Sequence, residues 1–181
     1  MFKREGLNKI KPKVYLAGPL FSEAERTFNH SLKKLLSPYF DVYLPQEDGG
    51  LIIHMIKAGL PPKLASQKVF DIDIRAMNEC DVFLIILDGR CVDEGAAFEL
   101  GFAHAKGKPC YGLKTDFRQL LAFGNNPMID GPLERIFESV DELLDWVESN
   151  CGTGLNSVDN EARDREESES IETEAKSSST S

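Results

Sequence analysis

The strongest constraint on the fold is a run of six apolar residues, Val-Phe-Leu-Ile-Ile-Leu, at positions 82–87. The run begins after Asp81 and ends at the turn sequence Asp88-Gly89-Arg90, so it predicts a buried strand. It is apolar on both faces, which is typical of a parallel strand covered by helices on both sides. The chain is therefore expected to be an α/β protein.

Other stretches of strand and helix alternate around this run. Ser22 followed by Glu25 predicts a capping box at the start of a helix. The sequence predicts that residues 46–62 form a long connection with a short helix. It predicts that residues 114–132 form a loop-rich region with an early helical turn. The expected strands are 13–18, 40–44, 81–87, 109–113 and 133–137, and the expected later helices are 63–80, 94–106 and 141–148. This order predicts a five-stranded parallel sheet with right-handed crossovers and helices on both faces.

The net charge of −9 is unevenly distributed along the chain. Residues 152–181 hold eight acids, three bases and no aromatic residue, which leaves residues 1–151 with a net charge of −4. We therefore expect a folded domain at 1–151 and an acidic, Ser-rich disordered tail at 152–181. The acidic balance argues against binding to a nucleic-acid polymer. No apolar stretch approaches the roughly 20 residues of a membrane span, so no membrane contact is expected.

The sequence lacks the common cofactor and metal motifs. Neither Gly-x-Gly-x-x-Gly nor the P-loop pattern occurs, so the usual phosphate cradles are missing. The four cysteines form no Cys-x-x-Cys pair and the three histidines are far apart, which argues against a zinc site or a disulfide framework. We therefore expect no cofactor and no metal. The first residues lack the apolar segment of a signal peptide, which makes the cytoplasm the default location.

Three carboxylates occupy positions that are unusual for surface residues. Glu99 is the only charged residue in the segment 95–103. A buried carboxylate lowers stability unless it is paired, so proteins retain one mainly where it has a function. Asp93 precedes the same helix, where it can act as an N-cap. Asp73 shares a helical stripe with core-like residues. Structural interpretations stay open, because Glu99 can point to solvent on the face of Lys106 and Asp73 can mark a helix boundary.

Acids gathered near one edge of the sheet suggest glycosidic chemistry. Ligands of parallel sheets bind at the carboxyl ends of the strands. Here those ends are Gly18-Pro19, Pro45, Asp88-Gly89-Arg90 and Lys114-Thr115-Asp116. One carboxylate can attack an anomeric carbon while another handles the proton of the leaving group. Tyr15, in the first expected strand, can orient the nucleophile through its hydroxyl or can be an ordinary strand aromatic.

Three segments carry a family resemblance when taken together. They are Val14-Tyr15-Leu16-Ala17-Gly18-Pro19, Asp73 with Asp81 eight residues later, and Asp93-Glu94-Gly95-Ala96-Ala97-Phe98-Glu99-Leu100-Gly101. Over about residues 13–147 the chain resembles the nucleoside 2-deoxyribosyltransferase family. The resemblance implies a flavodoxin-like three-layer sandwich. It also implies an enzyme of nucleotide salvage that passes a 2-deoxyribosyl group from a 2′-deoxynucleoside to a free nucleobase.

The resemblance implies roles for the four candidate catalytic residues. Glu99 matches the nucleophile, which forms a covalent deoxyribosyl intermediate, and Tyr15 matches the tyrosine that orients it. Asp93 and Asp73 match acids that bind the base edge or the sugar hydroxyls and assist protonation of the departing base.

The resemblance also implies where the substrate lies. It is expected against the loops at the strand ends, and a neighbouring subunit of a homo-oligomer completes the pocket with an Asn-x-Met segment. Asn126-Pro127-Met128 matches that segment, although Asn125 fits the same position. The expected substrate-binding residues are Gly18, Pro19, Asp88, Gly89, Asn126 and Met128.

Two other functions stay open. With water in place of the second base, the same site is an N-glycoside hydrolase of 2′-deoxynucleosides or of their 5′-monophosphates. The alternative outside enzymes is a non-catalytic nucleotide-binding module, and the presence of Glu99 counts against it.

In the monophosphate hydrolases that resemble this family, a small hydroxyl residue stands at the position of Asp93. A carboxylate there repels a phosphate dianion, which favours free nucleosides, while Arg90 and Arg118 leave the question open.

Overall fold

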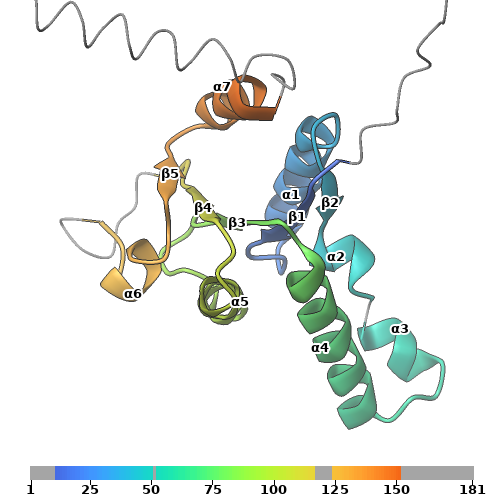
Figure 1. The fold of residues 1–181 in the computed structure, drawn as a ribbon. Coiled ribbons are helices and arrows are strands. Elements are labelled where there is room, and N and C mark those ends of the chain that lie inside the picture. Colours follow the sequence, from blue (N-terminus) through green and yellow to red (C-terminus); the bar gives the residue numbers. More distant parts are fainter. Residues whose placement is uncertain (1–10, 51, 117–123, 152–181) are drawn as a thin grey trace, which may run out of the picture. The chain divides into compact units, whose positions relative to one another are not determined.

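The computed structural model describes residues 11–50, 52–116 and 124–151. The chain divides into two units, residues 1–145 and 146–181, and the sheet lies in the first of them. Five parallel strands pair in the order β2-β1-β3-β4-β5 (Figure 1). The strands are β1 (Lys13–Ala17), β2 (Asp41–Tyr43), β3 (Val82–Ile86), β4 (Cys110–Leu113) and β5 (Arg135–Phe137). The predicted five-stranded parallel sheet is therefore confirmed.

Helices occupy most of the connections between the strands. They are α1 (Glu23–Leu36), α2 (Pro45–Asp48), α3 (Ile52–Lys57), α4 (Pro62–Glu79), α5 (Glu94–Ala105), α6 (Pro127–Asp130) and α7 (Val140–Cys151). The excursion after β2 thus contains two short helices where the sequence predicted one. The predicted early helical turn after β4 falls largely on residues 117–123, which lie outside the described residues.

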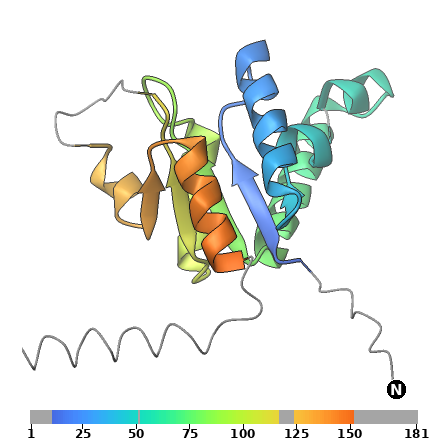
Figure 2. The ribbon, with the colours of Figure 1, turned by 90° about the horizontal axis from the view of Figure 1, so that it is seen from above.

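The two faces of the sheet are apolar, as the run at 82–87 predicted. Side chains alternate along a strand, so Tyr15 and Ile85 lie on one face while Leu16 and Ile86 lie on the other. The first face packs against α4 and α5 in a core cluster that includes Met77, and α1 lies on the opposite face (Figure 1, Figure 2). Helices on both faces bury β3. On the first face, α4 and α5 both contact the same strand, β1.

Helix α1 begins with the capping box that the sequence predicted. Ser22 Oγ accepts a hydrogen bond from the Glu25 backbone N–H at 3.2 Å, and Glu25 Oε2 accepts from the Ser22 N–H at 2.7 Å. The two contacts satisfy N–H groups that have no partner within the helix. They fix the point at which the chain leaves the loop after β1 and enters α1.

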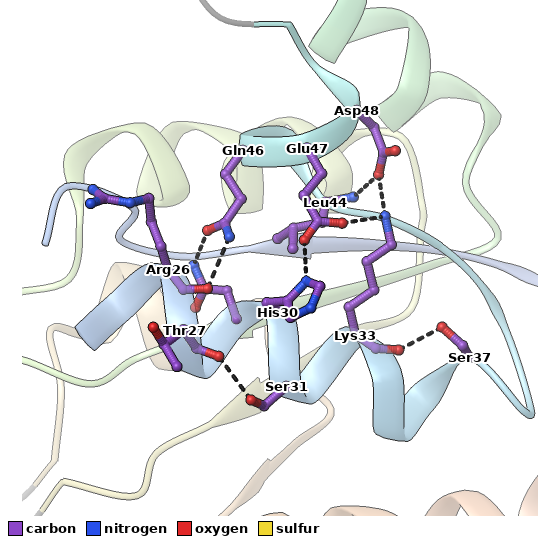
Figure 3. A network of polar contacts seen from close by, with 11 residues as sticks. Arg26, Thr27, His30, Ser31, Lys33, Ser37, Leu44, Gln46, Glu47 and Asp48 are labelled. Carbon is purple, nitrogen blue, oxygen red and sulfur yellow. Dashed lines mark hydrogen bonds and ion pairs between the residues drawn. The ribbon is translucent and has the colours of Figure 1, made fainter. Parts of the chain in front are cut away.

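A network of ion pairs holds α2 against α1 (Figure 3). Lys33 Nζ lies 3.1 Å from Glu47 Oε2 and 2.7 Å from Asp48 Oδ2. His30 Nδ1 lies 2.6 Å from Glu47 Oε1, and the Leu44 N–H donates to Asp48 Oδ2 at 2.8 Å. Isolated surface ion pairs contribute little, but here one lysine bridges two consecutive carboxylates of a four-residue helix. The network fixes the segment that follows β2.

The buried side chain of Asn29 links the loop after β1 to α2. Its Nδ2 donates to the Pro19 carbonyl at 2.9 Å and to Gln46 Oε1 at 3.0 Å. Gln46 Nε2 in turn donates to the Arg26 carbonyl at 3.0 Å. Because Asn29 is only 2 % exposed, these bonds form out of water, where an unmade hydrogen bond is costly. The loops after β1 and β2 are therefore held to one helix.

Residues 152–181, predicted as a disordered tail, lie outside the described residues, and the boundary at residue 151 stays a prediction. Among the residues that the structure describes, no helix is long and apolar enough to cross a membrane.

The capping box allows a test of the fold. Replacing Ser22 with Ala should lower the free energy of unfolding by about 1 kcal/mol, because one cap hydrogen bond is lost. The measurement is urea denaturation followed by circular dichroism. Ser31→Ala is the matched control, since Ser31 is an exposed serine within the same helix. Equal stability of Ser22→Ala and the wild-type protein would show that the box does not stabilise α1.

Candidate active site

Tyr15 and Glu99 form the central pair of the site. Tyr15 lies on β1 and points toward α5, where its hydroxyl donates a hydrogen bond of 2.6 Å to Glu99 Oε1. The tyrosine side chain is fully buried, and its ring stacks on Tyr43 and Phe83 with centroids 5.2 and 5.6 Å apart. A ring packed on both sides has little freedom, so its hydroxyl holds Glu99 in one orientation.

Burial disfavours the charge of Glu99. It raises the pKa of the Glu99 carboxyl from an ordinary 4.5 to about 7, and the charges of Asp73 and Asp93 act in the same direction. The hydrogen bond from Tyr15 opposes them, because it stabilises the carboxylate. Burial also raises the pKa of Tyr15, followed by the charge of Glu99, so its hydroxyl stays protonated and remains a donor. Carboxyls whose pKa is shifted by burial and neighbouring charges cluster at functional sites.

Asp73 lies on α4 and is held by a second tyrosine. The Tyr43 hydroxyl, at the end of β2, donates to Asp73 Oδ1 at 2.7 Å. Burial raises the pKa of Asp73 while this bond lowers it. Asp73 is half-buried, and its charge contributes to the pKa of Glu99. The structure therefore brings the predicted pair, Asp73 and Glu99, into one electrostatic unit.

Asp93 is the N-cap that the sequence predicted, and it also acts electrostatically on Glu99. It is the N-cap of α5, where its Oδ1 accepts a hydrogen bond of 2.8 Å from the Ala96 N–H. Its charge also raises the pKa of Glu99. The carboxylate therefore lies at the start of the helix that carries Glu99, close enough to affect its charge.

The loop after β1 approaches β3 closely. A Cβ atom at Gly18 would lie 2.9 Å from Ile86 Cβ, a distance that side chains do not tolerate, so glycine is required there. Pro19 follows and lines a cavity of about 540 Å³ together with Asp88 and Gly89. Three of the four predicted loop residues therefore meet at one cavity at the carboxyl ends of the strands.

Asp88 also organises the loop after β4. Its Oδ1 accepts from the Thr115 N–H at 2.6 Å and from the Asp116 N–H at 3.0 Å, and its Oδ2 accepts from Thr115 Oγ1 at 2.6 Å. Both carboxylate oxygens are thus engaged within the chain. A direct contact of Asp88 with substrate stays a prediction.

The Asn-x-Met segment lies at the start of α6. Asn126 caps α6, and its Oδ1 accepts a hydrogen bond of 2.9 Å from the Met128 N–H, while Met128 is 80 % exposed. Within the described part of the chain, neither side chain hydrogen bonds to Asp73, Asp93 or Glu99. Asn126 lines a cavity with Val92 and Ala97, which lie within two residues of Asp93 and Glu99 in the sequence. A contact of Asn126 or Met128 with substrate stays a prediction.

Asn125 is the other residue that the sequence left open at this position. Its Oδ1 accepts from Lys114 Nζ at 2.7 Å and its Nδ2 donates to Asp130 Oδ1 at 2.7 Å. Asn125 is thus engaged within its own chain, and of the two asparagines Asn126 lies beside the exposed Met128. Both asparagines line a cavity of about 230 Å³ with Arg90.

Among the described residues, no group of three His, Cys, Asp or Glu side chains is placed to hold a metal ion. The described cysteines Cys80, Cys91 and Cys110 are free thiols.

A family model described as nucleoside 2-deoxyribosyltransferase matches residues 14–157. The chain belongs to this family. Membership assigns it to enzymes that act on nucleosides and nucleobases, and the match includes every site residue discussed above. The family resemblance inferred from the three sequence segments is thereby confirmed.

Solved structures share the fold. A conserved protein of Enterococcus faecalis V583 is 28 % identical, with a TM-score of 0.64 over 77 % of this chain and 98 % of that one. A 2-deoxyribosyltransferase of Bacillus psychrosaccharolyticus is 24 % identical, with a TM-score of 0.61 over 73 % of this chain and 90 % of that one. No curated protein matches the chain. The flavodoxin-like fold that the resemblance implied is therefore confirmed.

Sequence reasoning missed Tyr43. It lies two residues before Pro45 at the end of an expected strand, and no motif marks it. Its importance appears only through the strand pairing, in which Tyr43 lies beside Tyr15.

The raised pKa of Glu99 predicts a pH-dependent stability. The folded chain binds the proton of Glu99 more tightly than the unfolded chain does, so stability falls as pH rises from 4.5 to about 7. Glu99→Gln removes this ionisation. The free energy of unfolding of the variant, relative to that of the wild-type protein, should therefore be higher at pH 8 than at pH 5, by up to about 3 kcal/mol. The measurement is urea denaturation at both pH values.

The control for that experiment is Glu94→Gln, which neutralises an exposed acid on the same helix. Its effect on stability should be the same at pH 5 and pH 8. If Glu99→Gln behaves like Glu94→Gln, burial does not disfavour the charge of Glu99.

Proposed function

We propose that this protein transfers a 2-deoxyribosyl group from a 2′-deoxynucleoside to another nucleobase through a covalent deoxyribosyl-Glu99 intermediate. The observation that carries the proposal is the part-buried Tyr15–Glu99 pair, with Asp73 and Asp93 as further acids acting on Glu99. A transfer reaction needs a carboxylate that attacks carbon and a second group that manages the proton of the leaving base. This family member has those groups and needs no cofactor for that chemistry.

The proposed reaction consists of two displacements. In the first, a carboxylate oxygen of Glu99 forms a bond to C1′ and the bond from C1′ to the base nitrogen breaks. The electron pair leaves with the base, which takes up a proton with the assistance of Asp73 and Asp93. In the second, a nitrogen of the incoming base attacks C1′ from the vacated face and loses its proton, and the Glu99 carboxylate is released. Two inversions give net retention at C1′.

The position of Asp93 supports free nucleosides over nucleotides as substrates. Its carboxylate stands at the N-terminus of α5 and acts electrostatically on Glu99. A phosphate dianion near that carboxylate would be repelled. The enzyme is therefore proposed to act in the salvage of unphosphorylated deoxynucleosides in the cytoplasm.

One experiment separates the three candidate functions, which are transferase, hydrolase and non-catalytic binding module. The protein is incubated with purine and pyrimidine 2′-deoxynucleosides, with and without a second base, and the products are separated by chromatography. Base exchange supports the transferase, free deoxyribose without exchange would identify a hydrolase, and binding without turnover would identify a non-catalytic module.

The nucleophile is tested by substitution. Glu99→Ala should lower kcat by at least about a thousandfold, because the covalent step loses its nucleophile. Glu94→Ala on the same helix is the control and should retain activity. Near-normal turnover by Glu99→Ala, with an intact fold by circular dichroism, would exclude the covalent mechanism.

A homo-oligomer is part of the proposed function. Two aromatic rings on α4 and α5 form an exposed apolar surface. Phe98, next to Glu99 in the sequence, is 55 % exposed and Phe70 is 50 % exposed, with ring centroids 6.3 Å apart. The partly buried ring of Phe102 extends this surface, with its centroid 6.4 Å from that of Phe98. Exposed contiguous aromatic surfaces are typical of subunit contacts. We propose that a second copy covers this surface and brings its Asn126 and Met128 to Glu99.

Mixed subunits test the shared site. Glu99→Ala and Asn126→Ala should each be nearly inactive alone, because every site then lacks one residue. Unfolding and refolding an equal mixture should restore about a quarter of wild-type activity, since half of the sites in each mixed dimer are intact. A mixture as inactive as its components, although light scattering shows dimers, would place both residues in one chain.

A further inference from the structure

Asp73 is connected to the rest of the site through Tyr43. The two residues come from different elements, β2 and α4, and are joined by the 2.7 Å hydrogen bond from the Tyr43 hydroxyl to Asp73 Oδ1. The bond is part-buried, and the Tyr43 ring stacks on Tyr15 at 5.2 Å with an interplanar angle of 23°. The site therefore contains two similar pairs, Tyr15–Glu99 and Tyr43–Asp73, in which each of the two stacked tyrosines donates a hydrogen bond to one carboxylate.

The segment after β2 encloses the Tyr43–Asp73 bond. A Cβ atom at Gly49 would lie 2.7 Å from Asp73 Oδ1, 2.8 Å from the Pro45 carbonyl oxygen and 3.2 Å from Tyr43 Oη. Glycine at this position therefore leaves room for the bond. Gly49 directly follows α2, which Lys33 holds against α1 through Glu47 and Asp48 (Figure 3). The ion-pair network thus fixes the backbone that lies over the bond.

We propose that Tyr43 is a positioning residue, which holds Asp73 as an ionised hydrogen-bond acceptor with Oδ2 directed to the base or sugar of the substrate. The inference rests on the proposed function and sharpens the role of Asp73. With Oδ1 occupied by the phenol, Asp73 orients the substrate as an acceptor. The inference thereby narrows the proposed reaction, in which Asp73 and Asp93 both assist protonation, and leaves proton donation to Asp93.

The charges around Asp73 explain why it needs this partner. Burial favours the protonated carboxyl, and Glu99 on α5 is a second carboxylate that interacts with Asp73. Tyr15 on β1 interacts with Asp73 too, but its hydroxyl is engaged with Glu99. Asp48 on α2 faces Tyr43 as a further negative charge. Tyr43 is the neighbour whose hydrogen bond lowers the pKa of Asp73.

The test replaces Tyr43 with Phe, which keeps the stacked ring and removes only the donor. Protein labelled with ¹³C at aspartate carboxyls is titrated by NMR, and the Asp73 signal is assigned by its loss in Asp73→Asn. The Asp73 carboxyl should titrate at higher pH in Tyr43→Phe than in the wild-type protein. With deoxynucleoside and acceptor base, kcat/KM should fall about tenfold or more, the loss expected for a hydrogen bond to a charged group.

Tyr111→Phe is the matched control. Tyr111 also lies on a strand and donates a 2.9 Å hydrogen bond to a carboxylate, that of Glu134, at an exposed position. Its removal should leave both the Asp73 titration and kcat/KM unchanged, and urea denaturation checks that both variants are folded.

The outcomes distinguish this inference from the proposed function. An Asp73 titration that is identical in Tyr43→Phe and wild type overturns the inference, whether or not the protein is active. An active wild-type enzyme whose kcat/KM is the same in Tyr43→Phe and Tyr111→Phe also overturns it and leaves the proposed function standing. A wild-type protein that turns over no deoxynucleoside contradicts the proposed function alone, and the titration then decides whether Tyr43 holds Asp73 ionised.

Discussion

The site depends on the balance between the burial of Glu99 and the hydrogen bond that it accepts from Tyr15. Burial and two neighbouring carboxylates disfavour the charge of Glu99, and the phenol opposes them. The phenol reaches Glu99 because β1 is an interior strand and α5 packs on the face that Tyr15 occupies. A carboxyl with a pKa of about 7 is partly ionised at neutral pH and is more basic than an ordinary glutamate.

Much of this arrangement follows from local patterns in the sequence. The apolar run at 82–87 predicts β3 and a two-sided sheet, and Ser22 with Glu25 predicts the start of α1 from four residues alone. Glu99 stands out because a single acid among small and apolar residues is costly to bury. Such signals lie within one element, so they can be recognised before the sheet order is known.

The remaining features depend on contacts between segments that are distant in sequence. Tyr43 and Asp73 are 30 residues apart, and a Cβ atom at Gly49 would meet their bond as well as the Pro45 carbonyl. The roles of Asn29 and Lys33 depend on the approach of α1 to α2, two elements that no sequence pattern joins. Asn125 and Asn126 are adjacent in sequence, and only their different partners, Lys114 and the Met128 N–H, separate them.

The stacked rings of Tyr43, Tyr15 and Phe83 have a consequence for how this scaffold can diverge. The ring contacts are apolar, whereas Asp73 and Glu99 are attached to different tyrosines on different strands. Mutations in the edge strand β2 and in the segment after it can alter the surroundings of Asp73 while β1 and α5 keep the Tyr15–Glu99 pair intact. With the roles proposed here, the edge of the sheet is the part of the scaffold where evolution can change substrate preference without rebuilding the Tyr15–Glu99 pair.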